Sequence, residues 1–483
     1  MALDQAYKKI CVLGFGESGK ALVKALLALK DEEGFEEIHL YPGSCPLKDR
    51  ELVERLTKEG LSCFEECQEI QGHYDLAIVS PGISPFTDFY KSAKEHSDEI
   101  IGEIEFAYRI SINPWLAITG TNGKTTTTSL IEHILQNAHR GAHAVGNIGP
   151  ASVTKALELR QEGNSEDYLV AEVSSFQLFG CKHFKPKVAI LLNITPDHVE
   201  WHQSLTHYIN SKKKVFQNLD DESLGIINLD DENSHAIERE LMLANKKLAF
   251  VSTKSSYDEG ALYHISTLEN SAWYEQGSLY IKQGNSIKEL IACDELQIQG
   301  EHNYFNAMCA ALCASYLGIS LSEIQEALKT FKALEHRIEF VNRIDGVSFY
   351  NDSKATNVDA VLKALTAFPK KEIVLLVGGH DKKTDLAEFS YKAVRACKAV
   401  VCFGEAQERF LEALTQANKQ EQDVSLAKAK NLKEALEVGK SLASSGDVVL
   451  LSPACSSFDE FSGYEERGRK FKEYVSEIAK ISG

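Results

Sequence analysis

Short apolar runs alternate with segments of helical periodicity along most of this chain. Near the start, the runs at 9–13, 37–41 and 75–79 are short enough for strands, and residues 20–30 have the apolar spacing of a helix. Regular alternation of strands and helices predicts a parallel sheet with crossover connections. We therefore predict a Rossmann-like α/β domain over residues 1–112.

The alternation continues through residues 113–333, where we predict a second domain. Its expected strands lie at 114–118, 168–173, 188–193 and 224–229, and helices are expected at 302–316 and 322–330. Residues 263–299 differ, because polar and apolar residues alternate there and turn signals occur at Gln276-Gly277 and Gln283-Gly284-Asn285. This pattern predicts a small antiparallel appendage.

A third domain is expected over residues 334–483, again with a doubly wound pattern. Its expected strands lie at 347–350, 373–377, 399–403 and 448–451. Unusual polar clusters follow three of these strands, and ligands in open α/β sheets lie beyond the carboxyl ends of strands. The fold class is thus α/β, with three domains each built on a largely parallel sheet with flanking helices, and we expect a substrate site in the third domain that faces the second.

The most informative chemistry follows the apolar run at 114–118. Residues 120–126 read Gly120-Thr121-Asn122-Gly123-Lys124-Thr125-Thr126 and lead into a helical pattern. A glycine-rich turn between strand and helix directs backbone amides at phosphates, while the lysine reaches the outer phosphates and a threonine hydroxyl can bind Mg²⁺. The match to the ordinary P-loop is imperfect, because its first glycine would fall at Ile118. We predict a phosphate site here in preference to an ordinary turn.

A second glycine motif, Gly14-Phe15-Gly16-Glu17-Ser18-Gly19, follows the first predicted strand. An NAD site would need an acidic residue at the end of the second strand to bind the ribose hydroxyls. That position reads Tyr41-Pro42-Gly43, so a dinucleotide is disfavoured, although the glycines could still hold a diphosphate.

Composition narrows the class of protein. The 483 residues suggest about three domains, and 43% hydrophobic with 25% charged residues is typical of a globular protein. A net charge of −18 argues against nucleic-acid and anionic-membrane partners. No apolar run approaches membrane-spanning length and the first residues lack a signal peptide, so we expect a cytoplasmic protein without membrane insertion. The 11 cysteines are scattered, which favours reduced thiols over disulfides or zinc.

Several residues could complete the phosphate site. Glu172 ends an apolar strand, where a Mg²⁺ ligand would lie, although a surface glutamate is the alternative. His198 also follows a strand; a lone histidine is usually structural, but its place beside the loop favours a role. His202 lies four residues later, yet the pattern is not H-E-x-x-H and we propose no zinc. Lys212-Lys213-Lys214 would ordinarily form a solvated helix face.

Taken together, these motifs resemble the Mur ligases, ATP-dependent amide-forming enzymes of peptidoglycan precursor synthesis. The resemblance covers nearly the whole chain and rests on residues 120–126, Glu172, 193–198, 301–306, His336-Arg337 and 351–357. The N-terminal glycine domain with Ser80-Pro81-Gly82-Ile83, the run 351–357 and the run 451–457 resemble the D-glutamate-adding member. The resemblance implies a reaction of UDP-N-acetylmuramoyl-L-alanine, D-glutamate and ATP through an acyl phosphate and a tetrahedral intermediate. We expect a monomer.

The resemblance also implies residue roles. Lys124, His198 and Lys212 would be catalytic. Two Mg²⁺ sites would use Thr125, Glu172, His198 and Lys212, the last as a carbamate formed with CO₂, although three adjacent lysines make that register less certain. ATP would be bound by Gly120, Thr121, Asn122, Gly123, Lys124, Thr125, Thr126, Asn303, Arg337 and Asp352. The UDP substrate would contact Gly14, Glu17, Ser18, Ser80, Asn147, Ser174 and Gln177. D-Glutamate would contact Lys354, Thr356, Lys382, Ser457, Phe458 and Tyr464.

One departure concerns uracil recognition, since Tyr41-Pro42-Gly43-Ser44 replaces the Asp-Thr-Arg-like residues often found in the family. Tyr41 could stack on uracil. Other ligases of the same fold, adding L-alanine or extending folylpolyglutamate, are alternatives that the C-terminal pocket residues disfavour, and a binding-only homologue is a further one. We expect domain movement about hinges near Asn113 and Leu334.

Overall fold

The computed structural model describes residues 7–43, 49–67, 69–254, 265–332, 335–368, 371–421 and 424–482. Leu334, Ser44 and the first two residues of the expected appendage lie outside these ranges. The chain divides into two compact units, residues 1–295 with 305–330, and residues 296–304 with 331–483. Within the described ranges, no helix is both long and apolar enough to cross a bilayer.

The N-terminal part is a five-stranded parallel sheet in the order β3-β2-β1-β4-β5. Its strands are β1 (Lys9–Leu13), β2 (Glu37–Tyr41), β3 (Leu61–Cys63), β4 (Tyr74–Val79) and β5 (Ser97–Gly102). Its helices are α1 (Glu17–Glu33), α2 (Arg50–Lys58), α3 (Asp88–Glu95) and α4 (Glu103–Ile110). The expected strands are confirmed, and α1 begins three residues earlier than predicted because Gly16 is its extended N-cap.

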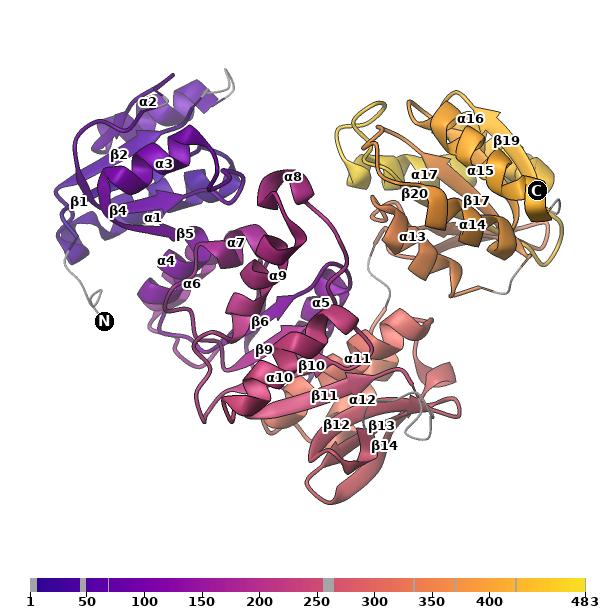
Figure 1. Ribbon diagram of the computed structural model, residues 1–483, viewed down its shortest axis with the longest axis horizontal. Coiled ribbons are helices and arrows are strands. Elements are labelled where there is room, and N and C mark those ends of the chain that lie inside the picture. The colour runs from indigo at the N-terminus through magenta and orange to yellow at the C-terminus, as the bar shows by residue number, and fades with distance from the viewer. Residues whose placement is uncertain are drawn as a thin grey trace. The chain divides into compact units, whose positions relative to one another are not determined.

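The central part of the first unit is built on a nine-stranded sheet in the order β14-β13-β12-β11-β10-β9-β6-β8-β7. Figure 1 labels β6 and β9 to β14 of this sheet. Its strands are β6 (Trp115–Thr119), β7 (Ala142–Gly146), β8 (Tyr168–Glu172), β9 (Val188–Leu191), β10 (Leu224–Asn228), β11 (Leu248–Ser252), β12 (Asn270–Glu275), β13 (Ser278–Gln283) and β14 (Ser286–Ala292). Its helices are α5 (Lys124–Asn137), α6 (Ser152–Glu162), α7 (Ser175–Phe179), α8 (Val199–His202), α9 (Leu205–Lys213), α10 (His235–Leu243), α11 (Glu301–Tyr316) and α12 (Leu321–Thr330).

The antiparallel segment has its predicted hairpins, but it is part of the main sheet. β12 pairs in parallel with β11, and β13 and β14 then pair antiparallel with their predecessors. The turns lie at Gln276-Gly277 and Gly284-Asn285, where positive φ values are found at Gln276, Gly277 and Gly284. The appendage therefore extends the parallel sheet at its edge.

The second unit contains a six-stranded sheet in the order β15-β16-β20-β17-β18-β19, parallel except for the β15–β16 hairpin. Its strands are β15 (Glu339–Ile344), β16 (Val347–Asn351), β17 (Ile373–Gly378), β18 (Cys397–Phe403), β19 (Ser425–Ala429) and β20 (Val448–Ala454). Its helices are α13 (Val358–Leu365), α14 (Ala387–Ala396), α15 (Gln407–Glu421), α16 (Leu432–Leu442) and α17 (Tyr464–Ser482). Separate apolar clusters pack on the two faces of the sheet.

Helix α4 joins the N-terminal and central sheets through two buried carboxylates. Glu105 is completely buried and accepts backbone N–H groups from Lys182, His183 and Phe184 at 2.9–3.0 Å, together with Nε of Arg109 at 2.9 Å. Glu103 accepts the backbone N–H of Val153 at 2.7 Å in the first turn of α6, and its burial raises the pKa of Glu103 to about 7.

The linker between the two sheets is also held in place. The Asn113 side-chain amide donates to the carbonyls of Asn164 and Asp167 at 2.9 and 3.0 Å. Because Asn113 is buried and tied to the central sheet on one side, with α4 locked on the other, this arrangement does not support the hinge that we expected there.

The contacts of Glu105 generate a stability prediction. Glu105→Ala would leave three backbone donors and Arg109 without their shared carboxylate, so we expect a loss of about 3 kcal/mol or more in unfolding free energy. Chemical denaturation followed by fluorescence measures this. The matched control is Glu36→Ala, because Glu36 pairs with Lys8 on the exposed surface and its loss should leave the transition unchanged. Equal shifts for both variants would contradict the proposed anchoring.

Candidate active site

The central sheet has a topological switch point at β6. The chain leaves β6 toward β7 and β8 on one side and returns to β9 on the other, so β6 lies between β8 and β9. Ligands in open α/β sheets bind where the strand order reverses, beyond the carboxyl ends of the strands. The carboxyl ends of β6, β8 and β9, with the segments that follow them, contain residues 120–126, Glu172 and the run 193–198. These residues are therefore brought to one edge of the sheet.

The loop after β6 has the backbone of an anion-binding turn. Gly123 is the N-cap of α5 with φ of +87°, a conformation that glycine adopts without strain, and α5 begins at Lys124. A Cβ atom at Gly123 would lie 2.6 Å from Oδ1 of Asn306 on α11. The first amides of α5 and the positive end of its dipole thus face the loop, as phosphate binding requires.

Neighbouring loops hold this turn in place. The backbone N–H of Asn122 donates to Oδ1 of Asn193 at 2.9 Å, and Nδ2 of Asn193 donates to the Asn122 carbonyl at 3.0 Å. Thr121 Oγ1 lies 3.0 Å from the Thr195 carbonyl and 2.9 Å from the Tyr208 hydroxyl. The loop after β9 and helix α9 therefore fix the shape of the phosphate loop.

Two lysine amines converge on a single carbonyl of the loop. Nζ of Lys124 donates to the Gly120 carbonyl at 2.9 Å, and Nζ of Lys212 donates to the same oxygen at 2.7 Å. Lys212 is only 2% exposed and also lies 4.8 Å from the centre of the Tyr208 ring. Burial, followed by repulsion from Lys124, lowers the pKa of Lys212 well below its usual range, against the attraction of Asp197 and Glu172.

The three consecutive lysines have different environments. Lys213 pairs with Glu240 near the surface, and Nζ of Lys214 donates to the carbonyls of Phe179 and Cys181. Lys212 is the member whose side chain points to the phosphate loop. The expectation of an ordinary solvated face for these lysines is thus wrong at Lys212.

Glu172 at the end of β8 is buried beside the loop after β7. One carboxylate oxygen accepts Nδ2 of Asn147 at 2.9 Å, and the Glu172 carbonyl accepts the backbone N–H of Asn147. The other oxygen, Oε2, is buried and has no hydrogen-bond partner among the residues that the structure describes. An unsatisfied buried carboxylate oxygen beside a phosphate loop fits a Mg²⁺ ligand. The surface-glutamate alternative is excluded by this burial.

Ser174 and Gln177 form the N-terminal cap of α7, directly after Glu172. Ser174 Oγ accepts the Gln177 backbone N–H at 3.3 Å, and Oε1 of Gln177 accepts the Ser174 backbone N–H at 2.9 Å. This reciprocal pair is a capping box. Both residues thus lie at the expected edge, with a demonstrated structural role.

His198 lies on the loop after β9 with a positive φ of 53° and a half-exposed side chain. Its ring contacts Phe176 edge-on at 4.8 Å, and its Nε2 lies 3.5 Å from Oδ2 of Asp197. His202 is directed elsewhere: it is completely buried between Ser175 and His207, with ring nitrogens 2.9 and 2.8 Å from them.

At the N-terminal sheet, the loops after β1 and β4 meet. Gly14 has φ of +85°, and Ser80 Oγ donates to its carbonyl at 3.3 Å. Gly19 packs so closely that a Cβ atom there would lie 2.1 Å from the Gly14 carbonyl oxygen. Ser18 lies in the first turn of α1, and the exposed Glu17 approaches Lys20.

Tyr41 is a core residue of this sheet. It is completely buried, stacked on Phe64 with ring centres 4.9 Å apart, and its hydroxyl lies 2.8 Å from that of Tyr74. This placement gives no support to the stacking of Tyr41 on uracil.

The second unit gathers its own set of expected residues at the carboxyl ends of β16, β20 and β17. Lys354 Nζ lies 3.7 Å from the centre of the Tyr464 ring, and Lys382 Nζ donates to the Thr356 carbonyl at 2.9 Å. Ser457 is buried, whereas Phe458 is 70% exposed and is therefore not a core residue of this unit. Lys354 with Tyr464 and Lys382 with Thr356 thus form two contacting pairs.

The residues expected to serve the nucleotide in this unit include Asp352, Arg337 and Asn303. Asp352 accepts the Ser452 hydroxyl at 2.7 Å, and burial raises the pKa of Asp352 to about 7, opposed by nearby Arg337. Asn303 lies in the first turn of α11, where its Nδ2 donates to the Gln299 carbonyl at 2.9 Å. These three residues belong to the second unit, whereas the phosphate-loop residues 120–126 belong to the first.

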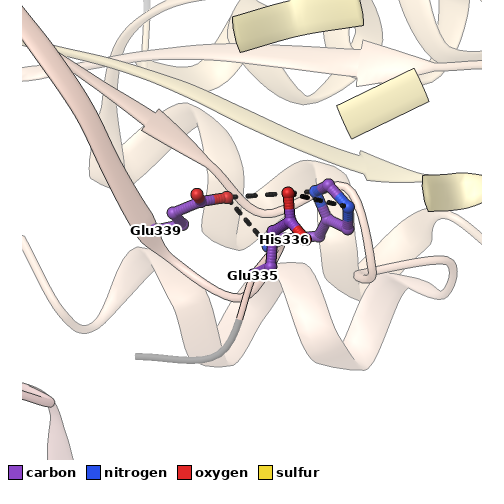
Figure 2. Close-up of side chains that lie close together, drawn as sticks. All are labelled: Glu335, His336 and Glu339. Carbon is purple, nitrogen blue, oxygen red and sulfur yellow. Dashed lines mark hydrogen bonds and ion pairs between the residues drawn. The ribbon is translucent and has the colours of Figure 1, made fainter. Parts of the chain in front are cut away.

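Figure 2 shows Glu335, His336 and Glu339, whose possible ligand atoms lie within 4.8 Å of one another. Lys472 donates to Glu339 at 2.9 Å and also binds Glu335, and the His336 Nδ1 lies 2.9 Å from Nδ2 of Asn351. Because Lys472 already pairs with both carboxylates and the His336 ring is hydrogen-bonded to Asn351, we do not assign a metal to this cluster.

Three contributors to these sites were missed from sequence. Tyr208 lies one helical turn before Lys212 on α9, so their i, i+4 spacing was the available signal. Asn193 was recognised as part of a motif without a role. Arg467 on α17 carried no signal, because an arginine in an exposed helical pattern is normally solvated.

With this geometry in place, three family descriptions match consecutive parts of the chain. The MurD N-terminal domain matches residues 9–89, the Mur ligase middle domain matches 118–314, and the Mur ligase glutamate ligase domain matches 336–455. The chain belongs to the Mur ligase family, which is a family of ATP-dependent ligases.

A curated relative from Thermoanaerobacter sp. (strain X514), named UDP-N-acetylmuramoylalanine--D-glutamate ligase, is 38% identical over 477 residues, which is 98% of each chain. Among solved structures, a pseudomurein peptide ligase type C from Methanothermus fervidus has a TM-score of 0.58 at 17% identity, covering 98% of this chain and 100% of its own. MurF ligase from Thermotoga maritima in complex with ADP has a TM-score of 0.58 at 16% identity, covering 92% and 96%. The two structures support the three-part α/β fold.

The backbone at Gly123 generates a prediction for nucleotide binding. Gly123→Ala would place a methyl group against Asn306, so we expect at least a ~10-fold loss of affinity for an ATP analogue, measured by calorimetry. Gly163→Ala is the matched control, because Gly163 also has a positive φ, +69°, but has nothing within 4 Å of the new Cβ. The control should cost about 1–2 kcal/mol of stability and leave affinity unchanged. Unchanged affinity in Gly123→Ala would refute the role of the loop.

Proposed function

We propose that this chain is an ATP-dependent ligase that joins D-glutamate to UDP-N-acetylmuramoyl-L-alanine in peptidoglycan precursor synthesis. The observation that carries the proposal is the match to ligases of this name over 98% of both chains, which includes the MurD-type N-terminal domain. The phosphate loop at the β6 switch point supports the use of ATP. Because the reaction consumes ATP, we expect it in the cytoplasm.

The chemistry begins from a carboxylate, which is a poor electrophile in water. The carboxylate of the alanyl residue attacks the γ-phosphorus of ATP, the bond to ADP breaks, and an acyl phosphate forms. The neutral amine of D-glutamate then attacks the acyl carbon, and the tetrahedral intermediate collapses with release of phosphate as the nitrogen loses a proton. Positioning and charge neutralisation supply most of the rate enhancement in such reactions.

The residues of the first unit suit the phosphoryl-transfer part of this reaction. The amides at the start of α5 and the Lys124 amine are suited to the β- and γ-phosphates of ATP. When bound, Mg²⁺ would neutralise charge on the transferring phosphoryl group. Thr125, Glu172 and His198 would hold it, and the unsatisfied Oε2 of Glu172 is the feature that supports this assignment.

The residues of the second unit suit an acidic amino acid. D-Glutamate has two carboxylates, and Lys354, Lys382, Thr356 and Ser457 offer charged and neutral donors from adjacent loops. Tyr464 orients Lys354 through the contact with its ring. We assign the exposed Phe458 to the same pocket as a wall residue, and Asp352, Arg337 and Asn303 to the nucleotide.

The UDP substrate is assigned to the first unit. The close approach of Gly14, Gly19 and Ser80 leaves backbone groups near the start of α1 for a diphosphate, with Glu17 and Ser18 beside them. Asn147, Ser174 and Gln177, at the ends of β7 and β8, are assigned to the muramoyl sugar or its peptide.

The main prediction concerns phosphate release from ATP in the presence of UDP-N-acetylmuramoyl-L-alanine. We expect release with D-glutamate and none above background with L-glutamate, glycine or L-alanine, because the relatives that match over the whole chain are named as ligases of D-glutamate. Bicarbonate should be supplied throughout. Release with a different amino acid would retain the ligase mechanism and overturn the assigned substrate, whereas tight nucleotide binding with no release would favour a binding-only homologue.

We further propose that Lys212 is carbamylated. A neutral lysine amine attacks CO₂, forms an N–C bond and releases one proton, which yields an anionic carbamate. The burial of Lys212, its lowered pKa, and its position between the phosphate loop and Glu172 all favour the neutral amine that this reaction requires. The anionic carbamate would offer its oxygens to Mg²⁺, together with the Glu172 carboxylate and the His198 imidazole.

This proposal predicts a specific spectroscopic signal. Protein equilibrated with ¹³C-bicarbonate should show a carbamate resonance by ¹³C NMR that Lys212→Ala lacks. Lys213→Ala is the control, since Lys213 pairs with Glu240 at the surface and should retain the resonance. Lys212→Ala should also lose at least ~100-fold in kcat, with partial recovery on adding short carboxylic acids. A resonance that persists in Lys212→Ala would show that the assigned lysine is wrong.

A further inference from the structure

The second unit contains a completely buried arginine, Arg467, in the first turn of α17. Its four recorded hydrogen bonds go to uncharged oxygens. Nε donates to the Ser353 hydroxyl at 2.9 Å, Nη2 donates to the carbonyls of Ser353 and Cys455 at 2.8 and 3.1 Å, and Nη1 donates to the Ser456 carbonyl at 3.2 Å. A buried cation whose hydrogen bonds go only to neutral groups is costly, and the positive end of its own helix adds to that cost. Attraction by the carboxyl groups of Asp459, Glu460 and Asp352 partly offsets it.

The guanidinium reaches all three strand ends that carry the amino-acid pocket. Ser353 follows β16 and immediately precedes Lys354, while Ser456 follows β20 and immediately precedes Ser457. The third strand end is close as well, because a Cβ atom on Gly379 after β17 would lie 3.0 Å from Nη1 of Arg467. That loop leads through His380, whose backbone N–H donates to the Ser456 carbonyl at 2.9 Å, to Lys382.

The helix itself is tied to the same network. The Ser353 hydroxyl donates to the Tyr464 carbonyl at 2.8 Å, and the Tyr464 ring lies against Lys354. One planar side chain with donors in a fixed fork therefore links the segments after β16 and β20, which carry Lys354, Thr356 and Ser457. The loop that carries Lys382 packs against this fork and is tied to it through the Ser456 carbonyl. A lysine at this position has a single amine and could not reproduce the fork.

We propose that Arg467 is the positioning residue of the amino-acid pocket: its guanidinium fixes the segments after β16 and β20 beside the loop after β17, and its fixed charge favours a substrate with two carboxylates. This inference rests on the proposed function, because it assumes that the pocket binds an acidic amino acid. Arg467 is fully buried and is hydrogen-bonded beside Lys354 and Ser457, so it acts through the pocket residues. Burial lowers the pKa of Arg467 to about 10, so the side chain remains a cation at neutral pH.

The test separates charge from geometry with Arg467→Lys and Arg467→Met, measuring KM for each substrate and kcat. For Arg467→Lys we expect the KM for D-glutamate to rise about 10- to 100-fold while the KM values for ATP and the UDP substrate change less than about 2-fold. Arg467→Met should raise the KM for D-glutamate further. It should also reduce the preference for D-glutamate over D-glutamine, which lacks the second carboxylate. Arg469→Met, an exposed position on the same helix, is the matched control and should behave as wild type.

Three results would overturn the proposal: an unchanged KM for the amino acid, equal changes in all three KM values, or an Arg467→Met variant that keeps the wild-type preference for D-glutamate. If Arg467→Met does not fold, Ser353→Ala carries the test, because it removes one acceptor of the fork without altering charge and must also raise the amino-acid KM selectively. Failure of the proposed function is distinguishable, because wild-type enzyme would then use a different amino acid, for which the same KM comparison can be made.

Discussion

The carbonyl oxygen of Gly120 is the point on which the site of the first unit depends. Two lysine amines donate to this oxygen. Lys124 lies at the start of α5, directly after the phosphate loop, and Lys212 lies on α9, far along the chain. Two cations cannot share one neutral acceptor in a buried place without a strong drive to lose a charge. Burial, with repulsion from Lys124 as the second cause, lowers the pKa of Lys212 and makes its amine suitable for reaction with CO₂.

The rest of the first unit can be understood as support for that arrangement. Asn193 and Thr195 from the loop after β9 fix the phosphate loop from one side, and Tyr208 fixes it from α9. Glu172 completes the edge with a buried oxygen that lacks a partner within the described residues. Glu103 and Glu105 tie helix α4 to the central part of the unit, so the loops assigned to the UDP substrate belong to the same compact unit as the phosphate loop.

The second unit also contains a buried basic side chain, that of Arg467. Arg467 is protonated and is satisfied by carbonyl and hydroxyl oxygens, where Lys212 is driven toward neutrality. The difference follows from the chemistry of the two side chains: a delocalised guanidinium can bind several fixed oxygens while keeping its charge, whereas a lysine amine loses its proton readily when buried. One cation is thus suited to covalent modification and the other to fixing loops.

Much of the fold was predictable, because local pattern and strand-end chemistry are properties of short segments. The strands at 9–13 and 37–41, the hairpins around Gln276-Gly277 and Gly284-Asn285, and the glycine-rich turn before α5 are set by periodicity, glycine and the helix start. The pairing of β12 with β11 was not predictable, since it depends on which sheet edge is available. The same holds for Tyr41, whose burial is decided by Phe64 and Tyr74, and for Lys212, one of three identical neighbours. The sequence by itself determined the strands, the phosphate loop and the chemical groups that the reaction needs. Only the tertiary structure decided which lysine and which arginine are buried, and which oxygen of Glu172 lacks a partner among the described residues. Burial and distance arise from contacts between residues far apart in the chain.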